Sequence, residues 1–217
     1  MIIDFHTHMF PDKIAARTID FLSKKGGDMN PFTDGTWKGL KESTKQAGID
    51  HSIVLPIATR PGQFHTINEF AAHFQEGTLI SFGSLHPESE NYKEELRQIR
   101  DMGMKGIKLH PDYQDTYFND IRYKRIISYA TELELVISVH AGRDPKCPDN
   151  IHCTPAMAEE VLNEVEPEKL VLAHMGGNEL WSEVEERLVG RNVYFDTGVI
   201  LDRMPQEQFL RMVREHG

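Results

Sequence analysis

The chain has 217 residues, 39% hydrophobic and 27% charged, so it can bury a sizeable core and does not resemble disordered or fibrous proteins. Its formal net charge of −10 argues against nucleic acid and against an anionic membrane surface as partners. Two cysteines, no apolar run approaching a membrane span and no signal-peptide pattern at the start predict a cytoplasmic protein.

Short apolar runs alternate with amphipathic stretches, which predicts parallel βαβ units in a single domain, residues 1–217. Seven runs rich in Ile, Val and Leu are predicted strands: residues 1–5, 52–57, 78–85, 105–110, 134–140, 169–174 and 192–196. Predicted helices follow at residues 12–23, 36–47, 66–75, 92–102, 121–131, 155–165, 180–188 and 205–215. Helix ends are marked by the Thr154–Pro155 start and by glycines at 48, 77, 103 and 190.

The units number seven, one fewer than in a complete (β/α)8 barrel. We therefore expect an α/β fold of the TIM type that lacks the eighth strand. The first and seventh strands would then each have one edge without a neighbouring strand, on the side of the gap. An open barrel, a partner chain that covers the gap, or a longer natural protein would each accommodate this, and an exposed gap favours a homo-oligomer. Two loops, residues 24–35 and 142–154, are longer than the fold requires; such excess is often functional, although a surface insertion explains the first equally well.

Four predicted strands end in histidine: His6 with His8, then His110, His140 and His174. The carboxyl ends of parallel barrel strands open onto one face, so these side chains should meet there. Because residues two apart on a strand share a face, Asp4 should point with His6 and His8, and Lys108 with His110. Imidazole is a good ligand for Zn²⁺ and similar ions, so the pattern predicts a divalent-metal site.

These motifs together resemble the amidohydrolase superfamily, specifically the amidohydrolase-related branch that includes aminocarboxymuconate-semialdehyde decarboxylase. The resemblance spans essentially the whole chain and is carried by Asp4-x-His6-x-His8, residues 106–111, His140, residues 172–177 and residues 193–197. It implies a distorted barrel with one divalent ion, most often zinc, held by His6, His8 and His140. It further implies that His174 is the general acid/base or the residue that orients water.

The family also has a metal-binding aspartate at the end of its eighth strand, and no such segment is present here. Asp196 belongs instead to the seventh-strand motif, so we expect it to support the ligands rather than to replace that aspartate. Lys108 and His110 are expected to anchor a substrate carboxylate. Two alternatives remain for Lys108: carboxylation to bridge two metals, or an ion pair with a nearby carboxylate.

The remaining candidates lie around this centre. Arg143, close after His140, suits an anionic group of the substrate at the rim. His86 is expected to be a supporting or structural residue. Cys147 and Cys153 flank His152 in the second long loop, and their Cys-x5-Cys spacing is wide for a zinc knuckle, so two loop thiols are the favoured interpretation.

The resulting prediction is a metal-dependent hydrolase that acts on a small molecule with an amide, lactone or ester bond. Activated water would attack the carbonyl, with His174 as its orienting base. The alternative is a metal-dependent, non-oxidative decarboxylase, since the same ligands serve both reactions. A second alternative, motivated by the missing strand, is an inactive or incomplete fragment of such an enzyme.

Overall fold

The computed structural model describes residues 1–26, 30–145 and 147–217. Its strands are β1 (Ile3–Thr7), β2 (His51–Val54), β3 (Leu79–Ser81), β4 (Gly106–Leu109), β5 (Val136–Val139), β6 (Leu170–Leu172) and β7 (Tyr194–Phe195). Its helices are α1 (Asp12–Lys25), α2 (Trp37–Gln46), α3 (Phe64–His73), α4 (Tyr92–Asp101), α5 (Ile121–Glu132), α6 (Pro155–Val165), α7 (Trp181–Arg187) and α8 (Gln206–His216). Each element overlaps its predicted segment, and every strand except β1 is shorter than its apolar run.

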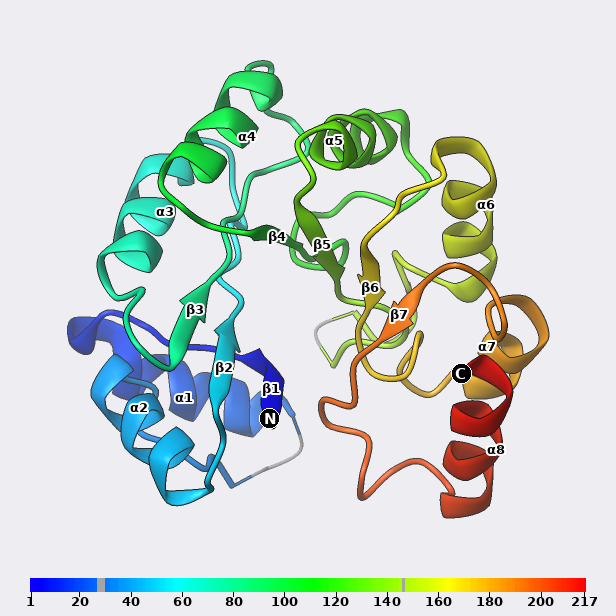
Figure 1. Cartoon of the computed structure of the whole chain (residues 1–217), viewed down its shortest axis with the longest axis horizontal. Coiled ribbons are helices and arrows are strands. Elements are labelled where there is room, and N and C mark those ends of the chain that lie inside the picture. Colours follow the sequence, from blue (N-terminus) through cyan, green and yellow to red (C-terminus); the bar gives the residue numbers. More distant parts are fainter. Residues whose placement is uncertain (27–29, 146) are drawn as a thin grey trace.

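The strands are all parallel and follow chain order around the molecule. One sheet has the order β1-β2-β3 and the other β4-β5-β6-β7, with a bridge between Gly83 and Ile107 linking them. The helices lie outside the strands, and β1 and β7 stand apart on the two sides of the opening (Figure 1). Among the described residues no pairing joins β7 to β1. The predicted TIM-type fold without an eighth strand is therefore confirmed.

Alternation along the central strands separates the core from the barrel interior. Ile107 and Leu109 on β4 and Val139 on β5 are fully buried in the main hydrophobic cluster, which also contains the inner faces of the helices. The alternate residue Lys108 is buried too, but its Nζ donates to Ser138 Oγ of β5 at 3.5 Å. The interior therefore carries polar groups where a purely structural barrel would carry aliphatic ones.

Local signals set the element ends. The Thr154 hydroxyl accepts from Met157 N at 3.3 Å and caps α6, as predicted. The four glycines predicted to stop helices all have positive φ, at positions 48, 77, 103 and 190. Parts of the two predicted long loops, residues 27–29 and residue 146, lie outside the described residues. Within the described segments, no helix has the length and apolar character needed to cross a bilayer.

Gly142, in the loop after β5, packs against the backbone of Asn178, in the loop after β6. Its φ is +86°, and a Cβ there would lie 2.0 Å from Asn178 N. We expect Gly142→Ala to lower the free energy of unfolding by about 3 kcal/mol, because backbone strain and overpacking add. Gly190→Ala is the matched control: φ is +78° but nothing lies within 4 Å of the added Cβ, so about 1 kcal/mol is expected. Urea unfolding followed by circular dichroism compares them, and equal losses would contradict the close approach.

Candidate active site

The carboxyl ends of β1, β4, β5 and β6 bring their histidines together. The His6 ring lies 4.9 Å from that of His174 and 5.2 Å from that of His8, measured between centroids. The His140 ring stacks on His110 at 4.1 Å and meets His174 edge-on at 4.9 Å. The structure thus confirms that these strand ends converge. We call these five residues the histidine cluster.

The two histidines of β1 are each anchored through Nδ1. His6 Nδ1 lies 2.8 Å from Asp196 Oδ2, and His8 Nδ1 lies 2.8 Å from the Leu55 carbonyl oxygen. A ring nitrogen that faces an acceptor carries a proton, so Nδ1 is the donor in both rings and Nε2 is the atom left to bind a ligand. Asp4 contributes at the backbone, where its Oδ1 accepts from His6 N at 3.2 Å. These hydrogen bonds fix the orientation of both rings and leave their Nε2 atoms available to bind a metal ion or a substrate.

Asp196, just after β7, links the two ends of the open barrel. Besides His6, it accepts from the backbone N–H groups of His174 and Gly198, both at 3.0 Å to Oδ1. Burial acts to raise its pKa, but the neighbouring His6, His174 and Lys108 outweigh burial and hold the pKa of Asp196 below its ordinary value. The carboxylate therefore stays ionised and supports the histidines, in agreement with its predicted position.

A depressed carboxylate pKa makes a pH-dependent contribution to stability. The folded state binds the Asp196 proton more weakly than the unfolded chain does, so the contribution is complete above the unfolded pKa of about 3.9 and disappears as pH falls further. We expect Asp196→Asn to destabilise the protein most at neutral pH, and the difference from wild type to shrink as the pH is lowered from 5 toward 3. Urea unfolding at stepped pH measures this, and a difference that does not change with pH would contradict it.

His174 follows β6 with φ of +60°, in the left-handed region. Its Nδ1 lies 2.8 Å from the Gly198 carbonyl oxygen and its Nε2 lies 3.1 Å from His140 Nδ1. Trp181 Nε1 donates to the His174 carbonyl at 3.0 Å, which fixes the backbone. Burial, followed by the neighbouring His6, lowers the pKa of His174 to about 3. At neutral pH the ring is thus neutral, with its proton on Nδ1 and a basic Nε2.

The two ring nitrogens of His140 differ in their surroundings: Nδ1 contacts His174, whereas Nε2 is buried and has no hydrogen-bond partner among the described residues. The nearest acidic groups are Asp144 Oδ2 at 3.7 Å and Asp112 Oδ2 at 3.8 Å, both too far for a hydrogen bond. Burial and the adjacent His110 lower the pKa of His140 well below its ordinary value. Asp112 was not among the predicted site residues, although its position directly after His110-Pro111, at the carboxyl end of β4, was a usable signal.

Lys108 and His110 occupy the barrel side of the histidine cluster. Burial lowers the pKa of Lys108 to about 8, while Asp196 acts in the opposite direction. Burial, together with Lys108 and neighbouring histidines, also lowers the pKa of His110 well below its usual value. The His110 ring lies between Tyr113, at 3.9 Å, and His140. A buried ammonium therefore stands beside neutral imidazoles, an arrangement that favours an anionic ligand.

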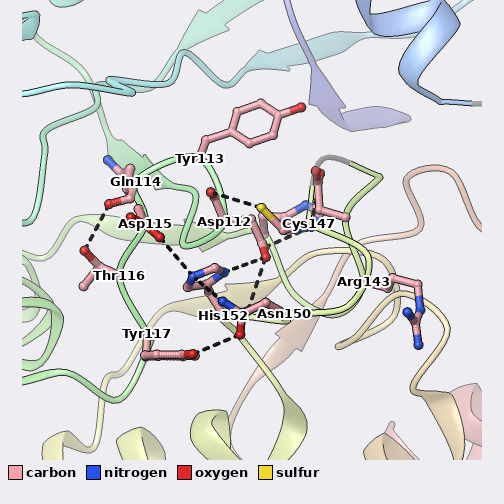
Figure 2. A network of polar contacts seen from close by, with 12 residues as sticks. Asp112, Tyr113, Gln114, Asp115, Thr116, Tyr117, Arg143, Cys147, Asn150 and His152 are labelled. Atoms are coloured by element: carbon pink, nitrogen blue, oxygen red, sulfur yellow. Dashed lines mark hydrogen bonds and ion pairs between the residues drawn. The ribbon is translucent and has the colours of Figure 1, made fainter.

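Two predicted residues lie outside the histidine cluster. Arg143 pairs with Glu179, with Nε 3.2 Å from Oε2, and also donates to the Pro148 carbonyl. Its side chain points away from the polar network around Asp112 (Figure 2). His86 follows β3, and its Nδ1 accepts from Glu88 N at 3.3 Å. The structure does not bring either residue against the clustered rings.

Ligand-type atoms at this end form two close groups. One consists of His6, His174 and Asp196, and the other of His110, His140 and Asp144; within each group the atoms lie within 4.8 Å of one another. His8 belongs to neither group. The trio of His6, His8 and His140 therefore stays a prediction as a ligand set, while the centre as a whole offers enough nitrogen and oxygen donors for a divalent ion.

Several solved structures share this fold. The structure is similar to 2,6-dihydroxybenzoate decarboxylase in complex with 2,6-dihydroxybenzoate, with a TM-score of 0.71 and 15% identity over 100% of this chain and 85% of the other. It is also similar to 5-carboxyvanillate decarboxylase from Sphingomonas paucimobilis, with a TM-score of 0.62 and 14% identity over 100% of this chain and 85% of the other.

A third similar structure is a probable 2-pyrone-4,6-dicarboxylic acid hydrolase from Acinetobacter baumannii with citric acid bound, with a TM-score of 0.58 and 14% identity over 90% of this chain and 69% of the other. At such identities these likenesses establish the fold alone. No curated protein matches the sequence. The sequence profile described as Amidohydrolase matches residues 3–213, nearly the whole chain. The chain therefore belongs to the amidohydrolase family.

Proposed function

We propose that this chain is a metal-dependent hydrolase that acts on a small molecule with an amide, lactone or ester carbonyl. The observation that carries the proposal is the meeting of five buried or half-buried imidazoles at one end of the barrel, two of them anchored through Nδ1 so that Nε2 is available. Packing alone would fill such a place with apolar side chains, because unpaired buried polar groups are costly.

The residues fit a divalent ion. We assign His6, His8 and His140 as its ligands, with zinc the best match to three nitrogen donors. Burial, followed by His6, lowers the pKa of His8 to about 3, so this ring is neutral, as coordination requires. The buried Nε2 of His140, which has no hydrogen-bond partner among the described residues, also supports coordination through that atom. Asp196 behind His6 has the place of a carboxylate that orients a metal-binding histidine.

A divalent ion supplies Lewis-acid activation of water and of the scissile carbonyl. His174 supplies the base: with Nδ1 directed at the Gly198 carbonyl, its Nε2 would accept a proton from the attacking water and return it to the leaving group. Lys108, and His110 beside it, would hold a carboxylate of the substrate in the barrel interior. Arg143 would serve at the rim only after leaving Glu179. Asp4 and His86 have supporting roles.

Non-oxidative decarboxylation is the second candidate. The observation that favours it is the buried Lys108 ammonium next to the histidine cluster, since a decarboxylase must hold a carboxylate at its reacting centre. The two fold relatives named as decarboxylases lend it support by analogy. The same ion and ligands would serve either reaction.

Metal analysis and a paired assay test the proposal. The protein is prepared without chelator, its Zn, Mn, Fe and Co are quantified, and the loaded protein is offered ester, lactone and amide substrates alongside aromatic carboxylates. Formation of the product carboxylic acid, measured by chromatography, reports hydrolysis, and carbon dioxide release reports decarboxylation. Hydrolysis without carbon dioxide supports the first candidate. Less than about a tenth of an equivalent of metal, with no uptake on titration, would refute both.

A further inference from the structure

A second group of metal-binding residue types lies on the loops beside the histidine cluster. Asp112 is on the connection from β4 to α5, and Cys147 and His152 are on the connection from β5 to α6. One ligand atom from each of the three lies within 4.8 Å of the others. Figure 2 shows the three side chains facing one another, with Arg143 turned away. The proposed hydrolase chemistry uses none of them as a ligand.

The Asp112 carboxylate is buried and only partly satisfied. Its side chain is 0% exposed, and its Oδ1 accepts from His152 N at 3.2 Å and lies 3.1 Å from His152 Nδ1. Its Oδ2 has no hydrogen-bond partner among the residues that the structure describes. Oδ2 faces His140 Nε2 at 3.8 Å, so Oδ1 is the oxygen that faces His152. The negative charge of a carboxylate buried in this way is costly unless a cation neutralises it.

His152 is held as a metal-binding histidine usually is. Its Nε2 lies 3.4 Å from Asp115 Oδ1, so a carboxylate backs the ring on the side away from Asp112. Tyr117 stacks on the ring at 4.9 Å, and its hydroxyl donates to Asn150 Oδ1. Phe118 N donates to the His152 carbonyl at 2.8 Å. These contacts fix the ring and present Nδ1 to Asp112.

Cys147 completes the group with a sulfur. Its Sγ lies 3.9 Å from the Asp112 carbonyl oxygen, and the residue is partly exposed, which gives an ion a path from solvent. Cys153 is fully buried and is not part of the group. A thiolate, an imidazole and a carboxylate together select zinc over magnesium or calcium. The distance between Asp112 Oδ1 and His152 Nδ1 is close to the separation of two ligands of one tetrahedral ion.

We propose that Asp112, Cys147 and His152 bind one zinc ion, distinct from the ion of the histidine cluster, with a water in the fourth position. Binding replaces the contact between His152 Nδ1 and Asp112 Oδ1 by bonds from both atoms to zinc, and leaves the ring proton on Nε2, which faces Asp115. It also forms a zinc–thiolate bond and releases the Cys147 proton to solvent. The ion ties the loop after β5 to the loop after β4. It also fixes Asp112, whose Oδ2 lies 3.8 Å from His140 Nε2, and so would hold the edge of the histidine cluster.

Cobalt(II) chloride titration, in a buffer with a phosphine reductant, distinguishes the two sites by spectrum. Cobalt bound to sulfur gives an intense near-ultraviolet charge-transfer band, whereas a site of nitrogen and oxygen donors gives only weak visible bands. We expect the wild type to show the intense band and to take up two equivalents. Cys147→Ser should lose the band and one equivalent. Cys153→Ser, the matched thiol control, should keep both.

Two further measurements distinguish loss of this site from loss of the histidine-cluster site. Zinc chloride should protect Cys147 from iodoacetamide, as read by peptide mass spectrometry, in wild type but not in His152→Ala. His6→Ala should lose the nitrogen-liganded equivalent and keep the charge-transfer band, so failure of the proposed function would leave this site visible. No charge-transfer band in the wild type, or an undiminished band in Cys147→Ser, would overturn the proposal.

Discussion

Replacing His174 with asparagine should lower kcat by about 10²- to 10⁴-fold, the usual contribution of a general base, while the metal content stays at the wild-type level. The His174 ring has its Nδ1 on the Gly198 carbonyl and is neutral, so Nε2 is the one basic atom that the substitution removes. Asparagine is preferred to alanine because residue 174 has φ of +60°, a conformation that asparagine tolerates well.

The control and the measurement separate a chemical role from a structural one. His73, exposed at the end of α3, is the matched position: His73→Asn should leave kcat unchanged. Turnover per bound metal ion and circular dichroism are measured for both variants. If His174→Asn were as active as wild type with the same metal content, His174 would not be the base. If the metal were lost along with turnover, His174 would act as a ligand rather than as a base.

Each of His6→Ala, His8→Ala and His140→Ala should abolish stable metal binding at the histidine cluster, so that the metal content falls by one equivalent. Loss of a partner that only orients a ligand typically costs 10- to 100-fold in affinity, so loss of a ligand itself should cost at least about 100-fold. Plasma mass spectrometry after gel filtration gives the stoichiometry. Thermal unfolding gives an independent readout, because an ion that binds only the folded state raises the Tm of wild type but not of the variants.

His8→Ala is the most informative of the three. His8 lies outside both close groups of ligand atoms, whereas His6 belongs to one and His140 to the other. If the ion were held by His6, His174 and Asp196, the His8 variant would keep it and His174→Asn would lose it. Retention by His8→Ala combined with loss in His174→Asn would therefore replace the proposed ligand set with that group.

Much of the site could be predicted from the sequence because strand direction and alternation are local properties. Parallel strands joined by helices place every carboxyl end on one face, so His140 and His174 could be expected to meet although 34 positions separate them. Alternation likewise placed Lys108 opposite the aliphatic side chains of β4. The seventh-strand motif predicted a supporting role for Asp196, which stays a prediction; the structure shows its contacts with His6 Nδ1 and with the backbone N–H of His174.

Other features depended on loop geometry, which alternation does not encode. Arg143 follows His140 closely in sequence, yet the turn at Gly142 carries it to Glu179 and away from the clustered rings. Asp112 lies two residues beyond His110, and only the folded connection aims one of its oxygens at His152 and the other at His140. The wide cysteine spacing favoured two loop thiols over a knuckle that uses both of them. It gave no sign that Cys147 alone would meet an aspartate from another loop.

By itself the sequence determined the order of strands and helices, the face on which the chemistry gathers and the family, because these follow from periodicity and from motifs at strand ends. Only the tertiary structure decided which atom of each imidazole is anchored and which is available. That choice depends on an acceptor supplied by a distant segment, such as Leu55 for His8 or Gly198 for His174. Hydrogen-bond partners 24 or 47 residues apart are set by packing, and no local pattern specifies them.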